Sequence, residues 1–496
     1  MASKFKNFIN GKWVEPASGK YFENINPASK TEVLGVFPKS DSSDVEKAAR
    51  SALTAFEKWK KIPAPKRGEI ILKAARLMKE KKEELARTAT KEMGKILMET
   101  RGDVQEGIDT AIYMAGEGRR LFGQTTPSEL RNKFAMTVRV PVGVVGIITP
   151  WNFPVAIPTW KIFPALICGN TMVFKPSTDS PESAVKLVEI LREAGVPDGV
   201  INLIFGSGSD AGKAIIAHPD IRLISFTGSS ETGRFIASEC GKKLKRCALE
   251  MGGKNAQIII DDADLDLAVD GALWGAFGTT GQRCTATSRL IVHKKAINDF
   301  THKLLERTKK IIIGNGLEDN TQMGPLINET QREKVHNYAG IGKKEDKAKL
   351  LTGGEPHTDG KCSQGFFYKP TIFTNGNPGM RIAQEEIFGP VVLIMPVKDF
   401  DEAIKVMNST QYGLSSSIYT KDLDLAFKAI EKIQSGIVYV NSPTIGAESH
   451  LPFGGVKNTG NGHREAGVTA LDIFSEWKTV YIDYSGRLQK AQIDPE

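Results

Sequence analysis

The sequence predicts an α/β fold of two or three domains, in which parallel sheets are covered by helices. A chain of 496 residues is too long for one ordinary hydrophobic core. Short apolar strands alternate with amphipathic helices over residues 144–226, and a second alternating unit occupies residues 254–441. Such alternation is typical of parallel strands whose connecting helices pack on both faces of a sheet.

The elements of the first half follow from local patterns. Asn10-Gly11 is expected to turn a small hairpin, and Pro181 to begin a helix that Ser180 caps. Helical spacing is predicted over residues 44–59, 66–92, 103–121, 180–195 and 211–217. Strands are predicted at residues 133–140, 144–148, 170–174, 200–205 and 223–226.

In the second unit, the pattern predicts a helix at residues 295–310 and strands at 257–260, 391–395 and 438–440. Residues 343–360 are charged and contain glycine, so we expect a surface excursion there. Near the end of the chain, residues 479–484 alternate like an exposed strand.

The composition is that of a globular protein with a solvated surface. The net charge of +8 is spread over interspersed bases and acids, so nucleic-acid binding is not expected. Residues 140–160 carry no charge, but four prolines interrupt them. We therefore expect two buried strand-like pieces and a loop there, not a membrane span.

Cysteine usage indicates the compartment. The five cysteines show neither paired nor metal-binding spacing, and residues 1–12 lack the apolar core of a signal peptide. Reduced thiols in a cytoplasmic protein without a metal site are the simplest interpretation.

Cys284 and Glu250 are the first candidate catalytic residues. Cys284 lies between a predicted helix and a strand, where a thiol can face a cleft. Glu250 ends an apolar strand just before Gly252-Gly253, so it is a candidate base. A base is needed because the nucleophile is the thiolate and free cysteine titrates near ~8.5. A cysteine hydrolase would use the same nucleophile, but the seven histidines show no recognisable pairing motif.

Two further segments complete an ordered set of motifs: Thr149-Pro150-Trp151-Asn152-Phe153-Pro154 and Glu385-Glu386-Ile387-Phe388-Gly389-Pro390. With them the chain resembles the aldehyde dehydrogenase superfamily over about residues 8–484. The resemblance implies a Rossmann-like dinucleotide-binding domain (residues 1–124 and 147–252) and an α/β catalytic domain (253–467). It also implies a small β oligomerisation arm (125–146 and 468–496) that forms a homodimer or homotetramer, because an exposed edge strand needs a partner.

The resemblance also implies a mechanism. Cys284 attacks the aldehyde carbon, and the Asn152 amide and the Cys284 backbone N–H stabilise the oxyanion. After hydride passes to nicotinamide, Glu250 activates the water that hydrolyses the thioester. Glu250 favours hydrolysis over transfer to coenzyme A, because acylating relatives generally lack a glutamate here. Cys284, Glu250 and Asn152 are all present, which argues against a non-catalytic scaffold protein of the same fold.

A cofactor site is expected where residues 226–233 follow a strand and open a helix, because helix N–H groups can face a pyrophosphate there. The glycine-rich residues 206–212 match a dinucleotide loop less well. By resemblance, Ser229 touches phosphate, Lys175 holds the adenosine ribose, and Glu386 and Phe388 hold the nicotinamide ribose and ring. The predicted cofactor residues are Trp151, Lys175, Ser177, Thr178, Gly208, Gly212, Phe226, Thr227, Gly228, Ser229, Thr232, Met251, Gly252, Glu386 and Phe388.

The position three residues after Lys175 bears on the choice between NAD and NADP. Members specific for NAD commonly carry a glutamate there, whereas this chain has Thr178. Without that carboxylate a 2′-phosphate is not repelled, and Lys175, Ser177 and Thr178 can donate hydrogen bonds to it. We expect NADP to be preferred, with NAD use left open because Asp179 is close.

By the same resemblance, the substrate is a small-molecule aldehyde that enters an apolar tunnel. Residues 282–289 and 451–457 are similar to those of the branch that oxidises 2,5-dioxopentanoate (α-ketoglutaric semialdehyde). Some members acting on carboxylate-bearing semialdehydes have arginine where this chain has Trp160, so other semialdehydes, glyceraldehyde and aliphatic aldehydes stay open. If the substrate is charged, Arg283 or His450 could meet that charge. The predicted tunnel residues are Phe153, Ile157, Trp160, Arg283, Thr285 and Phe453.

Overall fold

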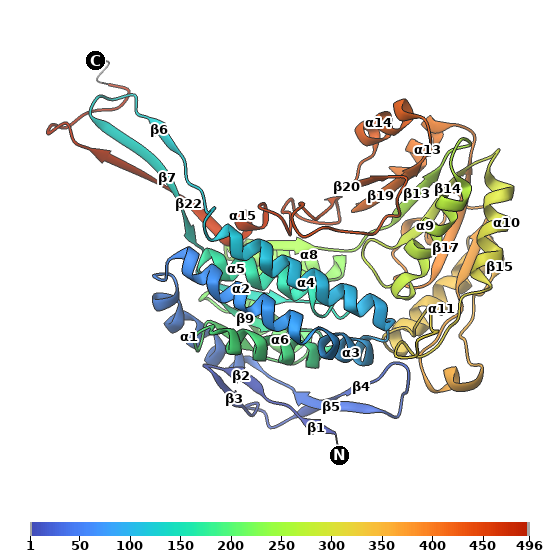
Figure 1. Cartoon of the computed structure of the whole chain (residues 1–496), viewed down its shortest axis with the longest axis horizontal. Coiled ribbons are helices and arrows are strands. Elements are labelled where there is room, and N and C mark those ends of the chain that lie inside the picture. The colour runs from blue at the N-terminus through green and yellow to red at the C-terminus, as the bar shows by residue number, and fades with distance from the viewer. Residues whose placement is uncertain (1, 494–496) are drawn as a thin grey trace.

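The computed structural model describes residues 2–493 and has two lobes with a long arm (Figure 1). Met1 and residues 494–496, the outer ends of two predicted domain ranges, lie outside the described residues. Each lobe is built on a seven-stranded sheet, and the two sheets come from the two predicted alternating units. The α/β prediction is confirmed.

The first sheet has five parallel strands in the order β12-β11-β8-β9-β10, extended by the hairpin β2-β3. The hairpin turns at Asn10 and Gly11, whose φ angles of 50° and 75° suit this predicted Asn-Gly turn. The strands are β2 Asn7–Ile9, β3 Lys12–Val14, β8 Val144–Ile148, β9 Thr171–Lys175, β10 Ile201–Leu203, β11 Ile221–Thr227 and β12 Arg246–Glu250.

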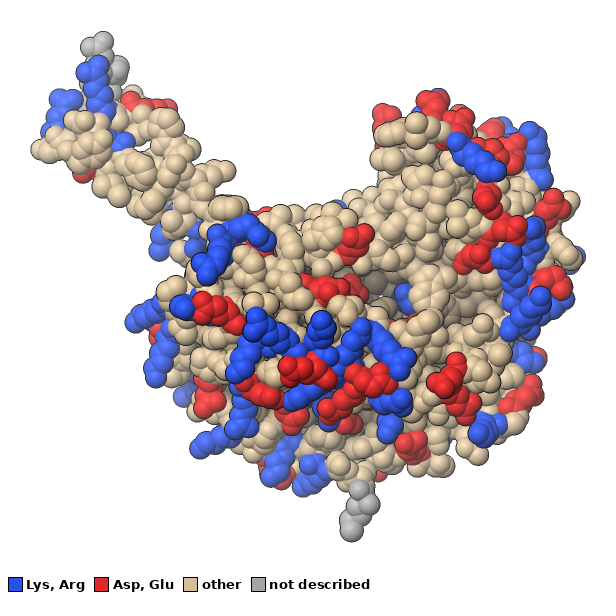
Figure 2. All heavy atoms as spheres, in the orientation of Figure 1, with Lys and Arg blue, Asp and Glu red and all other residues tan. Residues whose placement is uncertain are grey.

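Helices cover both faces of this sheet with separate apolar cores. One face carries α2 Ala64–Glu80, α3 Lys82–Met93, α4 Leu97–Glu117, α5 Ala156–Cys168 and α6 Pro181–Ala194. The other carries α1 Ser42–Trp59, a π-helical turn Gly208–Gly212, α7 Lys213–Ala217 and α8 Ser230–Lys242. Figure 2 shows bases and acids interspersed on the face that carries α2 and α4.

Three predictions of the first half need correction. The helix expected over residues 66–92 is two helices that meet at Lys81. The second half of the uncharged segment 140–160 begins helix α5, not a strand, because Pro158 lies in its first turn, where a missing N–H is tolerated.

The third correction concerns the cap of α6. Ser180 occupies the N-cap position, but its buried hydroxyl makes no hydrogen bond to any described residue. The Glu92 carboxylate instead accepts from the backbone N–H groups of Glu182 (2.5 Å) and Ser183 (2.9 Å). A carboxylate from a neighbouring helix therefore replaces the local serine.

The second sheet has the order β15-β16-β17-β14-β13-β19-β20, parallel except for edge strand β15. Because β15 lies within the expected surface excursion at 343–360, that prediction is wrong for this strand. The strands are β13 Asn255–Ile259, β14 Thr287–His293, β15 Lys349–Thr352, β16 Thr371–Thr374, β17 Val391–Val397, β19 Ser415–Tyr419 and β20 Ile437–Val440. The helices are α9 Leu265–Phe277, a 3₁₀ turn Gly278–Gly281, α10 Ile297–Thr308, α11 Glu329–Lys344, a 3₁₀ turn Gly360–Gln364, α12 Arg381–Gln384, α13 Phe400–Met407 and α14 Leu423–Lys432.

The arm is a three-stranded antiparallel sheet that projects from the first lobe (Figure 1). It consists of β6 Thr125–Pro127, β7 Lys133–Pro141 and β22 Ser475–Asp483, which follows α15 Ala470–Phe474. The C-terminal strand β22 pairs with β7 in the register Ser475 to Pro141 through Asp483 to Lys133, so the two ranges of the implied arm lie together. Trp477 and Tyr481 on this strand are exposed.

Two small sheets complete the fold. β1 Ser3–Lys4, β4 Tyr21–Ile25 and β5 Val33–Pro38 form one, and β18 Tyr412–Gly413 pairs with β21 Val456–Lys457 in the other. Among the helices of residues 2–493, none has the length and apolar character needed to cross a membrane.

Candidate active site

Cys284 lies in the predicted helix-to-strand junction, in the loop between the 3₁₀ turn after α9 and strand β14. The Asn255 side-chain amide donates to the Cys284 carbonyl oxygen at 2.7 Å and to the Ala286 carbonyl oxygen at 3.0 Å. At Gly281, φ is +69° and a Cβ would lie 2.3 Å from the Gly389 carbonyl oxygen, so only glycine fits. The thiol is thereby placed at the wall of a cavity of about 710 Å³.

Glu250 lines the same cavity from the end of β12 in the first sheet. It is buried, and neither carboxylate oxygen has a hydrogen-bond partner among residues 2–493. Burial, followed by the nearby Glu465 carboxylate, raises the pKa of Glu250 well above its ordinary value. Burial also raises the pKa of the Cys284 thiol to about 12. The Cys284 thiol is therefore protonated at neutral pH, and the environment of Glu250 favours its neutral carboxyl form over the carboxylate.

Asn152 follows β8 and lies beside the Cys284 loop. Its side-chain amide donates to the Gln282 carbonyl oxygen at 3.1 Å, while Lys95 Nζ donates to the Asn152 carbonyl oxygen at 3.0 Å. An amide nitrogen carries two hydrogens, so the second can face a substrate oxygen.

The sequence interpretation missed a buried ion pair behind Glu250. Lys161 of α5 donates to the Glu465 carboxylate, and both side chains are almost fully buried. The only signal available was a lysine in the otherwise apolar run of residues 156–168. This pair fixes a second carboxylate next to Glu250.

The predicted phosphate turn lies where β11 meets α8. Ser229 is the N-cap of α8, and its hydroxyl accepts from the Thr232 backbone N–H at 3.2 Å. Thr227 Oγ1 is buried without a hydrogen-bond partner in the described part of the chain. The Phe226 ring packs against Gly228, where a Cβ would lie 2.5 Å from it. An open hydroxyl beside a helix N-terminus suits an anionic group.

The predicted nicotinamide residues gather at the Cys284 loop. The Gly253 N–H donates to Glu386 Oε1 at 3.1 Å, and a Cβ on Gly252 would lie 2.0 Å from Glu386 Oε2. Trp151 and Phe388 contact each other edge to face, with ring centroids 5.4 Å apart. Met251 lines the cavity and packs against Gly233 of α8.

The remaining predicted cofactor residues lie at the carboxyl end of β9. Lys175 Nζ donates to the carbonyl oxygens of Pro176 (3.0 Å) and Gly206 (3.1 Å), and burial lowers its pKa to about 8. Ser177 and Thr178 follow and are half-buried. The π-helical turn bounded by Gly208 and Gly212 lies nearby, since a Cβ on Gly212 would contact Lys175.

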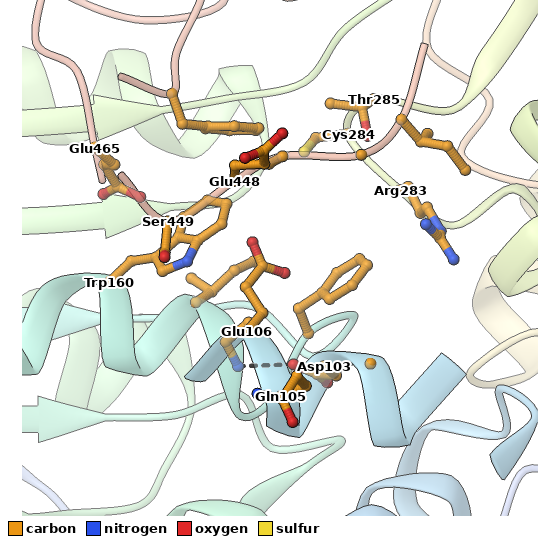
Figure 3. Close-up of a pocket in the computed structure, with 18 of the residues that line it drawn as sticks. Asp103, Gln105, Glu106, Trp160, Arg283, Cys284, Thr285, Glu448, Ser449 and Glu465 are labelled. Atoms are coloured by element: carbon orange, nitrogen blue, oxygen red, sulfur yellow. Dashed lines mark hydrogen bonds between the residues drawn. The ribbon is translucent and has the colours of Figure 1, made fainter. Parts of the chain in front are cut away.

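All six predicted tunnel residues line the cavity that contains Cys284 (Figure 3). The Trp160 and Phe453 ring centroids lie 4.7 Å apart, and Phe153 and Ile157 also line the cavity. Arg283 donates to Glu99 Oε1 at 3.0 Å and to Thr279 Oγ1 at 2.8 Å, so Glu99 already pairs its charge. His450 also lines the cavity, but half of its side chain is exposed.

Helix α4 supplies a wall that the sequence interpretation missed. Its cavity-facing residues, which we call the α4 wall, are Met98, Glu99, Gly102, Asp103, Gln105, Glu106 and Asp109. For Asp103, Glu106 and Asp109 the available signal was their spacing of three residues on the helix predicted over residues 103–121. Met98, Glu99 and Gly102 precede that predicted helix, because α4 begins earlier, at Leu97. Nothing in that pattern tells which face of the helix meets the cavity.

Comparison with known proteins agrees with this geometry. The model of the aldehyde dehydrogenase family matches residues 13–480. The alpha-ketoglutaric semialdehyde dehydrogenase of Bacillus subtilis is 42% identical over 96% of this chain and 98% of its own. The 2,5-dioxopentanoate dehydrogenase of Saccharolobus solfataricus is 43% identical over 95% and 98%.

A solved structure shows the same fold. Betaine aldehyde dehydrogenase from Staphylococcus aureus, in complex with NAD+, superposes with a TM-score of 0.95 at 37% identity over 97% of this chain and 96% of that one. Fold, motif order and full-length similarity agree, and the chain belongs to the aldehyde dehydrogenase family.

Proposed function

We propose that this aldehyde dehydrogenase oxidises 2,5-dioxopentanoate to 2-oxoglutarate and releases the free acid. The observation that carries the reaction is that Cys284 and Glu250, from different sheets, line one cavity. Two of the relatives that are 42–43% identical over nearly the full length, from Bacillus subtilis and Saccharolobus solfataricus, bear the names of this activity, which supports the choice of substrate.

The residues of the chain have separate roles in this proposal. The Cys284 thiol gives its proton to solvent and its sulfur bonds to the aldehyde carbon, while the free N–H of Asn152 stabilises the oxyanion that the carbonyl oxygen becomes. After oxidation, Glu250 takes a proton from water as the water oxygen bonds to the thioester carbon. The carbon–sulfur bond then breaks, which releases the acid and the Cys284 thiolate. Glu250 supports hydrolysis as opposed to transfer to coenzyme A.

Bound NAD(P) supplies the hydride acceptor. Thr227 and the N-terminus of α8 would hold its pyrophosphate, because the buried Thr227 hydroxyl is free within the described chain. Glu386 and Phe388 would hold the nicotinamide ribose and ring, and Lys175, Ser177 and Thr178 the adenosine ribose. On this basis we assign residues 1–124 and 147–252 to cofactor binding and residues 253–467 to catalysis.

NADP is the preferred cofactor in this proposal. The position three residues after Lys175 holds Thr178, so no carboxylate there opposes a 2′-phosphate. The nearby Asp179 carboxylate accepts from Asn328 Nδ2 at 2.9 Å and from the Ser177 hydroxyl at 3.3 Å, which offsets part of its charge. A tenfold or greater preference for NAD in kcat/KM would contradict this assignment.

The arm supports assembly into a homodimer or homotetramer, because β22 presents exposed aromatic side chains on an edge strand. All five cysteines are free thiols, which supports a cytoplasmic location. Sedimentation of the intact chain tests the assembly, and a monomer at micromolar concentration would contradict it.

The test of the substrate is NADPH formation with 2,5-dioxopentanoate, succinic semialdehyde, glyceraldehyde and propanal, with Cys284→Ala as the blank. We expect 2,5-dioxopentanoate to lead in kcat/KM by about tenfold, the effect of one good polar contact. If propanal or glyceraldehyde matches it, the proposed substrate is wrong. An acyl-CoA product on addition of coenzyme A would contradict the hydrolytic route.

A further inference from the structure

The α4 wall carries four carboxylates that line the cavity: Glu99, Asp103, Glu106 and Asp109. Three of them have partners. The pairs are Glu99 with Arg283 at 3.0 Å, Asp103 with Lys95 at 2.9 Å, and Asp109 with the Gln105 amide at 2.8 Å. These three carboxylates are therefore already paired or hydrogen-bonded within the protein.

Glu106 is different. Its Oε1 atom is buried and has no hydrogen-bond partner anywhere in residues 2–493. In Figure 3 the carboxyl group points into the cavity between Trp160 and Arg283, toward the loop that carries Cys284. A buried polar atom without a partner is unfavourable, and such atoms persist where a ligand completes the hydrogen bond.

Trp160 offers the complementary group. Its ring is 6% exposed, and the indole Nε1 is buried and unpartnered within the same described residues. An indole nitrogen can only donate a hydrogen bond, so its partner must be an acceptor such as a carboxylate or oxo oxygen. Glu106 Oε1 and Trp160 Nε1 are thus two of the cavity's polar atoms without a partner among the described residues; the others are both carboxylate oxygens of Glu250, Glu465 Oε2 and Thr227 Oγ1.

We propose that Glu106 and Trp160 bind the polar end of the aldehyde substrate, remote from its carbonyl, by donating hydrogen bonds to its carboxylate or 2-oxo oxygens. The inference rests on the proposed function in that the substrate carries an acid at that end. Trp160 then takes over from the arginine found at its position in some semialdehyde dehydrogenases. Arg283 is not needed for this role because Glu99 already pairs it.

The protonation state of Glu106 decides whether it attracts or repels an acid. Burial, followed by the Asp103 charge, raises its pKa to about 8. Below that pH its carboxyl group donates; above it, the carboxylate repels a substrate anion. The charges that act on Glu106 are those of Asp103 and Asp109 of α4, Lys95 before α4 and Arg283 of the Cys284 loop. Tyr439 of β20 is influenced by both Glu106 and Glu448.

The test compares wild type with Glu106→Gln, which keeps the shape and a donor but cannot ionise. The readout is the ratio of kcat/KM for 2,5-dioxopentanoate to kcat/KM for uncharged pentanal, from well below to well above pH 8. The ratio cancels groups that act on every aldehyde, such as Glu250 and Cys284. We expect it to fall about tenfold through pH 8 in wild type and to stay level in Glu106→Gln.

Asp109→Asn is the matched control. It removes a carboxylate that lies one turn after Glu106 on α4 and that already accepts a hydrogen bond from Gln105. It should keep a fall of the same size, with its midpoint at lower pH, because the Asp109 charge helps to raise the pKa of Glu106. A level ratio in wild type, or an unchanged fall in Glu106→Gln, would overturn the assignment. The ratio needs only measurable turnover of an acid-bearing aldehyde, so if propanal proves the better substrate, the proposed function fails while Glu106 is still tested.

Discussion

The reactive residues (Cys284 and Glu250 in the cavity wall, with Asn152 beside the Cys284 loop) and the α4 wall are built in different ways. The reactive residues lie at strand ends of two sheets: Glu250 is the last residue of β12, and Asn152 and Cys284 lie in loops after β8 and before β14. Glycine fixes the Cys284 loop at Gly281. The α4 wall is one face of a helix, whose side chains can change without disturbing the backbone. Chemistry common to all aldehydes can thus stay constant while the wall adapts to one substrate.

This comparison predicts that changes at the reactive end lower activity with every aldehyde alike. The largest effect is expected for Cys284→Ala, which removes the nucleophile and should reduce NADPH formation by at least about 1,000-fold. Cys362→Ala, at a buried thiol on the 3₁₀ turn after β15, is the control and should retain activity. Appreciable turnover of any aldehyde by Cys284→Ala would contradict the assignment of Cys284 as the nucleophile.

Glu250→Gln should lower kcat by roughly 10²–10⁴-fold, because the thioester loses its general base. If Glu250 acts only in hydrolysis, rapid mixing will show a stoichiometric burst of NADPH before the slow steady state, with every aldehyde tested. A slow steady state without a burst would mean that Glu250 also removes the Cys284 proton.

Glu465→Gln should move the pH profile of kcat. Glu250 acts as a base only when deprotonated, so kcat rises with pH through its raised pKa. Removing the Glu465 charge, and leaving Lys161 unpaired, both lower that pKa, so the rise should shift to lower pH. Breaking a buried pair also destabilises the fold by about 3–5 kcal/mol, so thermal unfolding should be recorded with the profile. An unmoved profile in a folded variant would refute the electrostatic role of Glu465.

Trp160→Phe should have the smallest effect and the most selective one. It removes the indole N–H but keeps an aromatic wall against Phe453. KM for 2,5-dioxopentanoate should rise roughly threefold to tenfold while KM for pentanal stays constant. An equal rise for both aldehydes would show that Trp160 only shapes the cavity.

Local patterns predicted an element correctly where interactions between residues close in sequence determine its structure. The Asn10-Gly11 turn follows from a short-range signal and appears in the structure. The arm, whose strands pair segments distant in sequence, is instead what the family resemblance implies. The predicted cap of α6 was wrong, because Glu92, which is distant in sequence, accepts the hydrogen bonds of the helix N–H groups in place of the adjacent Ser180 hydroxyl. Sequence patterns cannot anticipate a competitor that arrives through tertiary packing.

The sequence by itself determined the α/β class and the family resemblance, because four ordered motifs mark loops whose backbone geometry the fold requires. It also singled out Cys284, Glu250 and Asn152. Only the tertiary structure decided which face of α4 meets the cavity, that Arg283 is already paired with Glu99, and that Glu106 and Trp160 carry unmet polar atoms. These depend on burial and on partners distant in sequence, and neither property is encoded locally.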